Sequence, residues 1–335
     1  MSNTTSQPRR GIGPAIALFF LAPYIAEFLL GNLPITLLVA LVLLAPFYGG
    51  GALLIREFVR RTGRGWPSIM LLGIAYGILE EAFATQSLFN PNYLGKNFHL
   101  LDPAYIPALG IGAWWTLFVL TLHTAWSICT SIALAEALVP DRRTTPWLGN
   151  IGLAIVALVF AVAAVAMTRM SYKQDHFLAS NAQFASAAIA IVILAVIAFR
   201  LPRAKPATGT AAAPNPWLTG IVTLLLASGI LLVPQKWNWG AAASVFALDA
   251  AAILLISLWS RSVNWTPLHQ LALAAGAALA YAWHSFIELP AVGATVAQLA
   301  IVRTGNAIFT LLAIALIFIA ARRSSRSLPA LVTQT

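Results

Sequence analysis

Ten apolar runs, each about as long as a membrane span, dominate this chain of 335 residues. A helix needs roughly 20 mainly apolar residues to cross the hydrocarbon core of a bilayer. The runs lie at 12–31, 34–55, 68–88, 110–138, 148–168, 182–200, 217–234, 240–259, 267–288 and 296–320. Only 9% of the residues are charged, against about a quarter in soluble proteins. We therefore predict an all-α fold, a polytopic integral membrane helical bundle of about ten transmembrane helices.

The basic residues predict the orientation of this bundle. If the helices alternate in direction, 15 of the 20 Lys and Arg residues fall on the side of the N-terminus. Cytoplasmic loops carry such an excess of Lys and Arg, so we expect both termini in the cytoplasm and the chain in the plasma (bacterial inner) membrane. The net charge of +10 comes from short clusters between apolar runs. This distribution predicts membrane lipid as a partner and no nucleic acid.

Two loops differ from the others. Residues 201–216 are rich in Ala and Pro and predict a flexible cytoplasmic linker. The linker would divide one integral membrane domain, 1–335, into helices 1–6 within 1–200 and helices 7–10 within 217–322. The external loop 89–109 is longer and holds aromatic residues and three prolines. Such a loop can be a lid over an outward-facing cavity or an ordered connection at the interface.

Ionisable residues within the apolar runs are the candidate functional residues. Charged groups at bilayer depth are costly, face the protein interior and mark functional sites by default. The deep ones are Glu27, Glu80, Glu81, His123, Asp249 and His284. Asp249 is isolated, and the sequence names no partner for it.

The acidic pair Glu80–Glu81 and His123 are expected to meet. They lie on consecutive antiparallel helices at similar depth, and consecutive elements are usually neighbours. Because each helical residue advances by about 100°, one carboxylate is expected to face a central cavity and the other a neighbouring helix. A carboxylate that bonds a histidine is a candidate general base or metal ligand. Tyr76 and Thr85, each one helical turn from a carboxylate, are its expected hydrogen-bond donors.

The segment Gly77-Ile78-Leu79-Glu80-Glu81, followed on the next helix by His123, resembles the CAAX-prenyl-protease-like and bacteriocin-processing (CPBP) intramembrane glutamic proteases. That family has Glu-Glu-x-x-x-Arg, then Phe-x-x-x-His, then a later His-x-x-x-Asn/Asp. The resemblance covers two helices. Thr85 replaces the arginine, Val119 the phenylalanine and Glu288 the final Asn/Asp.

The resemblance implies a peptide hydrolase that forms no covalent intermediate and needs no cofactor. Glu80 would be the base that activates water, Glu81 its partner, His123 a stabiliser of the transition state, and His284 the later histidine. The substrate would be a membrane-anchored peptide or a small molecule. A metal held by Glu81, His123 and His284 is an alternative, since these are acceptable zinc ligands.

Two further interpretations of the function remain open. Ten helices divided as five plus five have opposite orientations, as an inverted-repeat transporter requires. Helix 3 then corresponds to helix 8 and helix 4 to helix 9, which matches the acidic pair with Asp249 and His123 with His284. This pattern predicts a proton-coupled carrier. The third reading is a non-enzymatic membrane protein whose polar residues serve helix association.

Overall fold

The protein is an all-α membrane bundle, as predicted. The computed structural model describes residues 11–96, 98–204, 209, 212–291 and 293–332. Within these residues, seven helices are long and apolar enough to cross a membrane, and Gly13–Leu29 and Pro216–Leu231 are shorter apolar helices. Together with Pro267–His284, they match the ten predicted spans in order.

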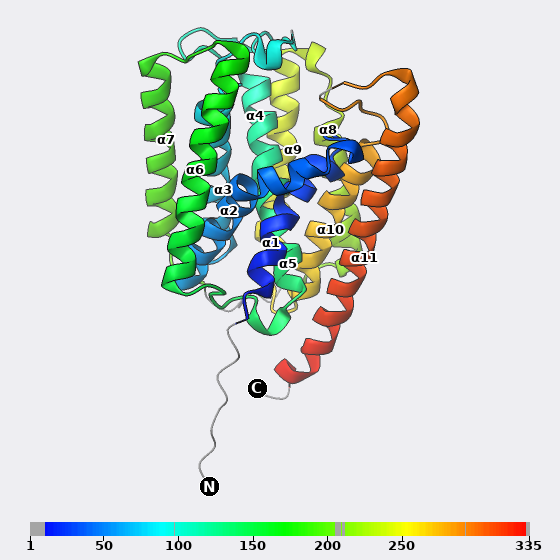
Figure 1. The fold of residues 1–335 in the computed structure, drawn as a ribbon. Helices are drawn as coiled ribbons and strands as arrows, with labels where there is room; N and C mark the ends of the chain where they lie inside the picture. Colours follow the sequence, from blue (N-terminus) through cyan, green and yellow to red (C-terminus); the bar gives the residue numbers. More distant parts are fainter. Residues whose placement is uncertain (1–10, 97, 205–208, 210–211, 292, 333–335) are drawn as a thin grey trace.

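The main helices run up and down the bundle, with α6 and α7 at one side of Figure 1 and α11 at the other. In chain order they are α1 (Gly13–Pro23), α2 (Val39–Arg61), α3 (Trp66–Leu79), α4 (Ala113–Thr121), α5 (Ser131–Ala137), α6 (Asn150–Asp175), α7 (Asn181–Arg200), α8 (Pro216–Leu231), α9 (Trp239–Trp259), α10 (Pro267–His284) and α11 (Leu299–Val332). Short 3-10 turns lie in the connections: η2 (Ile35–Leu37), η4 (Tyr93–Gly95), η6 (Pro140–Arg142), η7 (Gln235–Trp237) and η8 (Val296–Gln298). The strands β1 (Tyr105–Ile106) and β2 (Ile111–Gly112) form a small antiparallel pair. β1 lies in the predicted external loop, whereas β2 occupies the start of the predicted fourth span, whose helix α4 begins only at Ala113.

Three spans contain π-helical segments. The segment η1 (Tyr24–Leu29) continues α1, η3 (Glu80–Ala84) continues α3, and η5 (Leu122–Thr130) joins α4 to α5. The length of the apolar runs did not predict these segments. π-helical turns are rare, and they occur often at functional sites.

Several predicted helix ends were wrong. The third span ends at Ala84 instead of 88, because the chain turns there and Gln86 adopts a positive φ of 59°. The ninth ends at His284 instead of 288. In contrast, α6 continues to Asp175 and α11 to Val332, beyond the predicted 168 and 320. A span predicted from a run of apolar residues ends where polar residues begin, whereas a helical backbone can continue through them.

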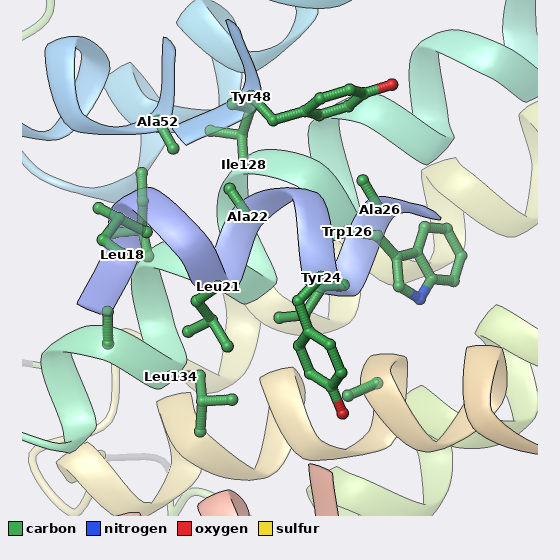
Figure 2. Packing of buried hydrophobic residues seen from close by; sticks show 14 of the residues in the cluster. Leu18, Leu21, Ala22, Tyr24, Ala26, Tyr48, Ala52, Trp126, Ile128 and Leu134 are labelled. Atoms are coloured by element: carbon green, nitrogen blue, oxygen red, sulfur yellow. The ribbon is translucent and has the colours of Figure 1, made fainter. Parts of the chain in front are cut away.

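The core is built around α1. Leu18, Leu21 and Ala22 are buried and pack with residues of α2, η5 and α5 in one cluster. Figure 2 shows α1 passing among these elements, with Tyr48 and Trp126 beside it. In contrast, α6 has no buried residue along its length. The first span therefore buries one face in the core and leaves Ile16 and Phe20 exposed, while α6 presents its apolar side chains to lipid.

The start of α1 and the end of α11 lie at the same face of the bundle, as predicted. The Arg142 guanidinium donates to the Gly11 carbonyl at 3.0 Å, before α1, and Arg323 of α11 donates to the Leu138 carbonyl at 2.8 Å. Part of the predicted linker 201–216 lies outside the described residues. Of the rest, the Ala204 amide donates to the Gly63 carbonyl at 3.0 Å and the Ala213 amide to the Ser262 hydroxyl at 3.0 Å. Its flexibility stays a prediction.

Candidate functional site

The structure brings Glu80, Glu81 and His123 together inside the bundle. His123 Nε2 lies 2.7 Å from Glu81 Oε1, and His123 Nδ1 lies 3.1 Å from Glu80 Oε2. All three residues are buried, with exposed fractions of 1%, 5% and 7%. We call these three residues the Glu–His–Glu cluster. Their meeting confirms the expected contact between the third and fourth spans.

The expected divergence of the two carboxylates was wrong. Glu80 and Glu81 reach different nitrogens of the same imidazole ring. They start a π-helical segment, and His123 lies in another. A flat ring placed between two adjacent side chains can be held from both of its nitrogens. The 100° step of an α-helix therefore did not separate the two groups.

The two carboxylates differ in how firmly they are held. Glu81 accepts hydrogen bonds from Thr85 Oγ1, at 2.9 Å, and from the Ser87 hydroxyl. Ser87 in turn accepts a hydrogen bond from Trp115 Nε1 at 2.9 Å. In contrast, the buried Oε2 of Glu80 has its 3.1 Å contact with His123 Nδ1 and accepts no hydroxyl hydrogen bond from the described residues. Glu81 is thus held by His123 and two hydroxyl groups, whereas Glu80 Oε2 is held by His123.

A third acid extends the polar region toward the first span. Tyr48 of α2 donates its hydroxyl proton to Glu27 Oε1 at 2.5 Å, and Asn32 Nδ2 lies 3.3 Å from Glu27 Oε2. The Tyr48 ring lies 6.3 Å from the His123 ring, centroid to centroid. Glu27 belongs to η1. The three π-helical segments of the described chain therefore all carry buried or partly buried ionisable residues of this region.

The loop after η3 covers the external side of these acids. Asn90 Nδ2 and the Leu94 amide donate to Asp175 Oδ2 of α6, at 2.8 and 3.0 Å. Tyr93 lies between these two anchors. Burial, and then the negative charges of nearby acids led by Glu81, raise the pKa of the Tyr93 phenol well above its ordinary value. The loop is thus an ordered cover, held by hydrogen bonds to α6.

His284 is not a member of the cluster. It ends α10, and its Nε2 lies 3.7 Å from the carboxylate of Glu288, which is 60% exposed. Its Nδ1 is buried without a hydrogen-bond partner in the described part of the chain. The predicted assembly of His284 with Glu81 and His123 was therefore wrong. The helical spacing from Glu288 was correct, but spacing within one helix cannot say which span lies opposite.

A metal would find its ligands in Glu80, Glu81 and His123. One candidate ligand atom from each lies within 4.8 Å of the others, and carboxylate oxygens with an imidazole nitrogen form a set that Zn²⁺ accepts. Both ring nitrogens of His123 already face carboxylates. Binding a metal through the imidazole would therefore require His123 to give up one of these contacts.

Sequence reasoning found the cluster and missed several of its supporting residues. Ser87 and Trp115 were absent from the predicted site, because both lie outside the helical turns next to the carboxylates. Glu27 was recognised only as a deep acid. Its link to Tyr48 depends on how α1 crosses α2, where a Cβ on Gly49 would collide with the Phe19 carbonyl. No spacing within the sequence encodes that crossing.

The match to known families covers nearly the whole chain. A family model described as an uncharacterized membrane protein family matches residues 16–328. The chain belongs to this uncharacterized membrane protein family. No curated protein and no solved structure matches it. The description of this family agrees with the membrane fold described above.

Proposed function

We propose that this protein is an intramembrane hydrolase that cleaves an amide bond of a membrane-anchored peptide. The observation that carries the proposal is the Glu–His–Glu cluster, in which Glu81 is held by His123 and by two hydroxyl groups, whereas the buried Oε2 of Glu80 meets His123 without a hydroxyl donor among the described residues. Buried acids beside a histidine at bilayer depth are the groups expected of acid–base chemistry. The resemblance of this segment to CPBP proteases points in the same direction.

In the proposed reaction, Glu80 is the general base. Its carboxylate takes a proton from a water molecule, the water oxygen bonds to the carbonyl carbon, and the carbonyl electron pair moves onto oxygen. His123, charged and donating from both nitrogens, is held by Glu81. Protonation of Glu80 frees the His123 Nδ1–H to stabilise the oxyanion. The intermediate collapses as the C–N bond breaks and Glu80 gives its proton to the leaving nitrogen.

A cleft on the external side supports substrate approach from that face. It has a volume of about 710 Å³ and lies between the predicted external loop and the α6–α7 connection. Its walls include Phe89, Tyr105, Phe177 and Gln183. Aromatic and amide side chains suit an extended peptide, which needs apolar contacts and a few hydrogen bonds. Movement of the loop held by Asp175 would open the way from this cleft to the cluster.

The test is cleavage in proteoliposomes that contain a library of fluorogenic, single-span peptides. Glu80→Gln should lower the cleavage rate by roughly 10²- to 10⁴-fold, the usual contribution of a general base. Glu288→Gln, a change of the same kind at an exposed helix end, should leave the rate unchanged. Equal cleavage by the wild type and Glu80→Gln would refute the proposal. Since no metal takes part in the proposed reaction, a chelator should have no effect.

A proton-coupled carrier is the second candidate, favoured by the polar row that joins Glu27 and Tyr48 to the cluster. The contacts between helices give less support to the five-plus-five inverted repeat. α3 packs against η5, whereas the corresponding α9 packs against α4 and α8. Asp249 bonds Thr121 instead of His284. Substrate-driven acidification of the same proteoliposomes, without peptide cleavage, would favour the carrier. We propose the bacterial inner membrane as the location in either case.

A further inference from the structure

Asp249 lies at the middle of α9 and has no cationic partner among the residues that the structure describes. It is the central residue of Trp239–Trp259 and is half-buried. Thr121 donates its hydroxyl proton to Asp249 Oδ2 at 2.6 Å. Within the described part of the chain, no Lys, Arg or His nitrogen lies within 4.0 Å of this carboxylate, and Oδ1 accepts no hydrogen bond. A carboxylate at this depth requires a donor or a cation.

A cavity of about 120 Å³ lies directly beside this carboxylate. It is lined by α8, α9, α10 and the stretch from Thr121 to Trp126. The cavity exists because small side chains line it. Each of these four elements contributes one alanine: Ala125, Ala227, Ala252 and Ala277. The cavity is therefore built into the packing of four helical segments.

The cavity is amphipathic along its length. On α9 it follows one face, from Asp249 through Ala252 and Ile256 to Trp259. Ten residues of helix correspond to about 15 Å. Among the described lining residues, Asp249 is the one ionisable group, and the polar remainder is hydroxyl groups and indole nitrogens. The lining thus has a charged end and a long apolar part.

We propose that this cavity binds a single-chain lipophilic amine taken from the bilayer. The ammonium group pairs with Asp249 Oδ1, and the alkyl chain lies along the face of α9 toward Trp259. A divalent metal ion does not suit the site, because it takes several oxygen ligands and the lining offers one carboxylate. The indole of Trp126 borders the cavity and adds aromatic surface, which attracts ammonium groups. The inference is independent of the hydrolase proposal.

The experiment compares n-octylammonium with n-octanol, a neutral molecule of similar shape, on the full chain in lipid nanodiscs. The measured quantity is the concentration dependence of the unfolding temperature. Octylammonium should raise this temperature saturably, and octanol should bind at least about tenfold more weakly. Asp249→Asn should reduce octylammonium affinity at least about tenfold. Asp141→Asn, an exposed aspartate of the η6 turn, is the matched control and should bind as the wild type does.

A second variant keeps the test decisive if Asp249→Asn does not fold. Ala252→Leu leaves the carboxylate in place and fills the cavity one turn away, so it should also weaken octylammonium binding about tenfold or more. Equal affinity for octylammonium and octanol in the wild type would overturn the proposal. So would unchanged octylammonium binding in either variant, or stabilisation by sodium chloride alone that Asp249→Asn removes.

Discussion

At the scale of single residues, the two adjacent glutamates of the site have different hydrogen-bond partners and therefore different proposed roles. Both contact His123, and the second oxygen of Glu81 is held by the hydroxyl groups of Thr85 and Ser87. A buried carboxylate with several donors is fixed in orientation. Within the described chain, Glu80 Oε2 has the 3.1 Å contact with His123 Nδ1 and no hydroxyl donor, so Glu80 is the less firmly held of the two. The difference arises from Thr85 and Ser87, which follow η3 at the turn out of the membrane.

The hydroxyl of Ser87 should therefore matter to activity although it does not touch the substrate in the proposed reaction. Ser87→Ala removes one of the two hydroxyl donors of Glu81 and leaves Trp115 Nε1 without its acceptor. A hydrogen bond to a charged group contributes about 1.5–3 kcal/mol. We expect peptide cleavage to slow by roughly ten- to hundredfold. Ser244→Ala, at an exposed hydroxyl bonded only to its own helix, is the control and should have no effect.

At the scale of elements, the π-helical segments explain what sequence reasoning could and could not find. Apolar runs predicted ten spans, and the antiparallel order of the third and fourth predicted the meeting of Glu81 with His123. The convergence of Glu80 on the same ring was missed, because it depends on local π-helical geometry that apolar periodicity does not reveal. His284 was misplaced because the sequence does not encode which non-consecutive helices are neighbours.

The close packing of α3 against η5 should control the site geometry. A Cβ added to Gly77 would lie 3.0 Å from Leu120 Cδ2 and 3.2 Å from His123 Cβ. Gly77→Ala should therefore push His123 away from the glutamates and lower cleavage about tenfold or more, since small displacements of reacting groups are costly. Gly152→Ala in α6 is the control, because its Cβ would meet only ordinary contacts with Leu148. Unchanged cleavage by Gly77→Ala would show that this contact tolerates the methyl group.

A buried ion-pair network fixes α2 to α5 at the basic face of the bundle. Arg60 makes two hydrogen bonds to the Glu136 carboxylate, at 2.8 and 2.7 Å, and Arg56 Nε lies 3.1 Å from it. Arg56 also stacks over Trp147, with Cζ 3.3 Å from the ring centroid. Glu57 accepts from the Trp147 amide at 2.8 Å. These contacts hold the 142–148 connection against the bundle.

Removing the Glu136 charge should destabilise the fold. Glu136→Gln leaves two buried guanidinium groups without their shared counter-ion, and breaking a buried ion pair costs about 3–5 kcal/mol. We expect a clearly lower midpoint of denaturation in detergent, measured by tryptophan fluorescence. Asp102→Asn, a change at a carboxylate that is 69% exposed, is the control and should leave the midpoint in place. Equal midpoints would mean that the arginines find other acceptors.

At the scale of the whole molecule, one face of the bundle carries most of its positive charge. Arg56, Arg60, Arg142 and Arg323 all lie at the face where α1 begins and α2 ends. The opposite face holds the ordered loop with η4, β1 and β2, together with the cleft beside it. The excess of Lys and Arg predicts that the first face is cytoplasmic. The Glu–His–Glu cluster, near the end of the outward-running third span, then lies in the outer half of the membrane.

This orientation can be tested by labelling single cysteines in sealed, right-side-out vesicles. On a Cys129→Ala background, Asp102→Cys would lie in the predicted external loop and Asp141→Cys in the η6 turn of the cytoplasmic face. A membrane-impermeant maleimide should label the first variant directly and the second only after the vesicles are opened. Both native side chains are exposed, so accessibility does not distinguish them. The reverse labelling pattern would place the acids in the inner half and would require the substrate to approach from the cytoplasm.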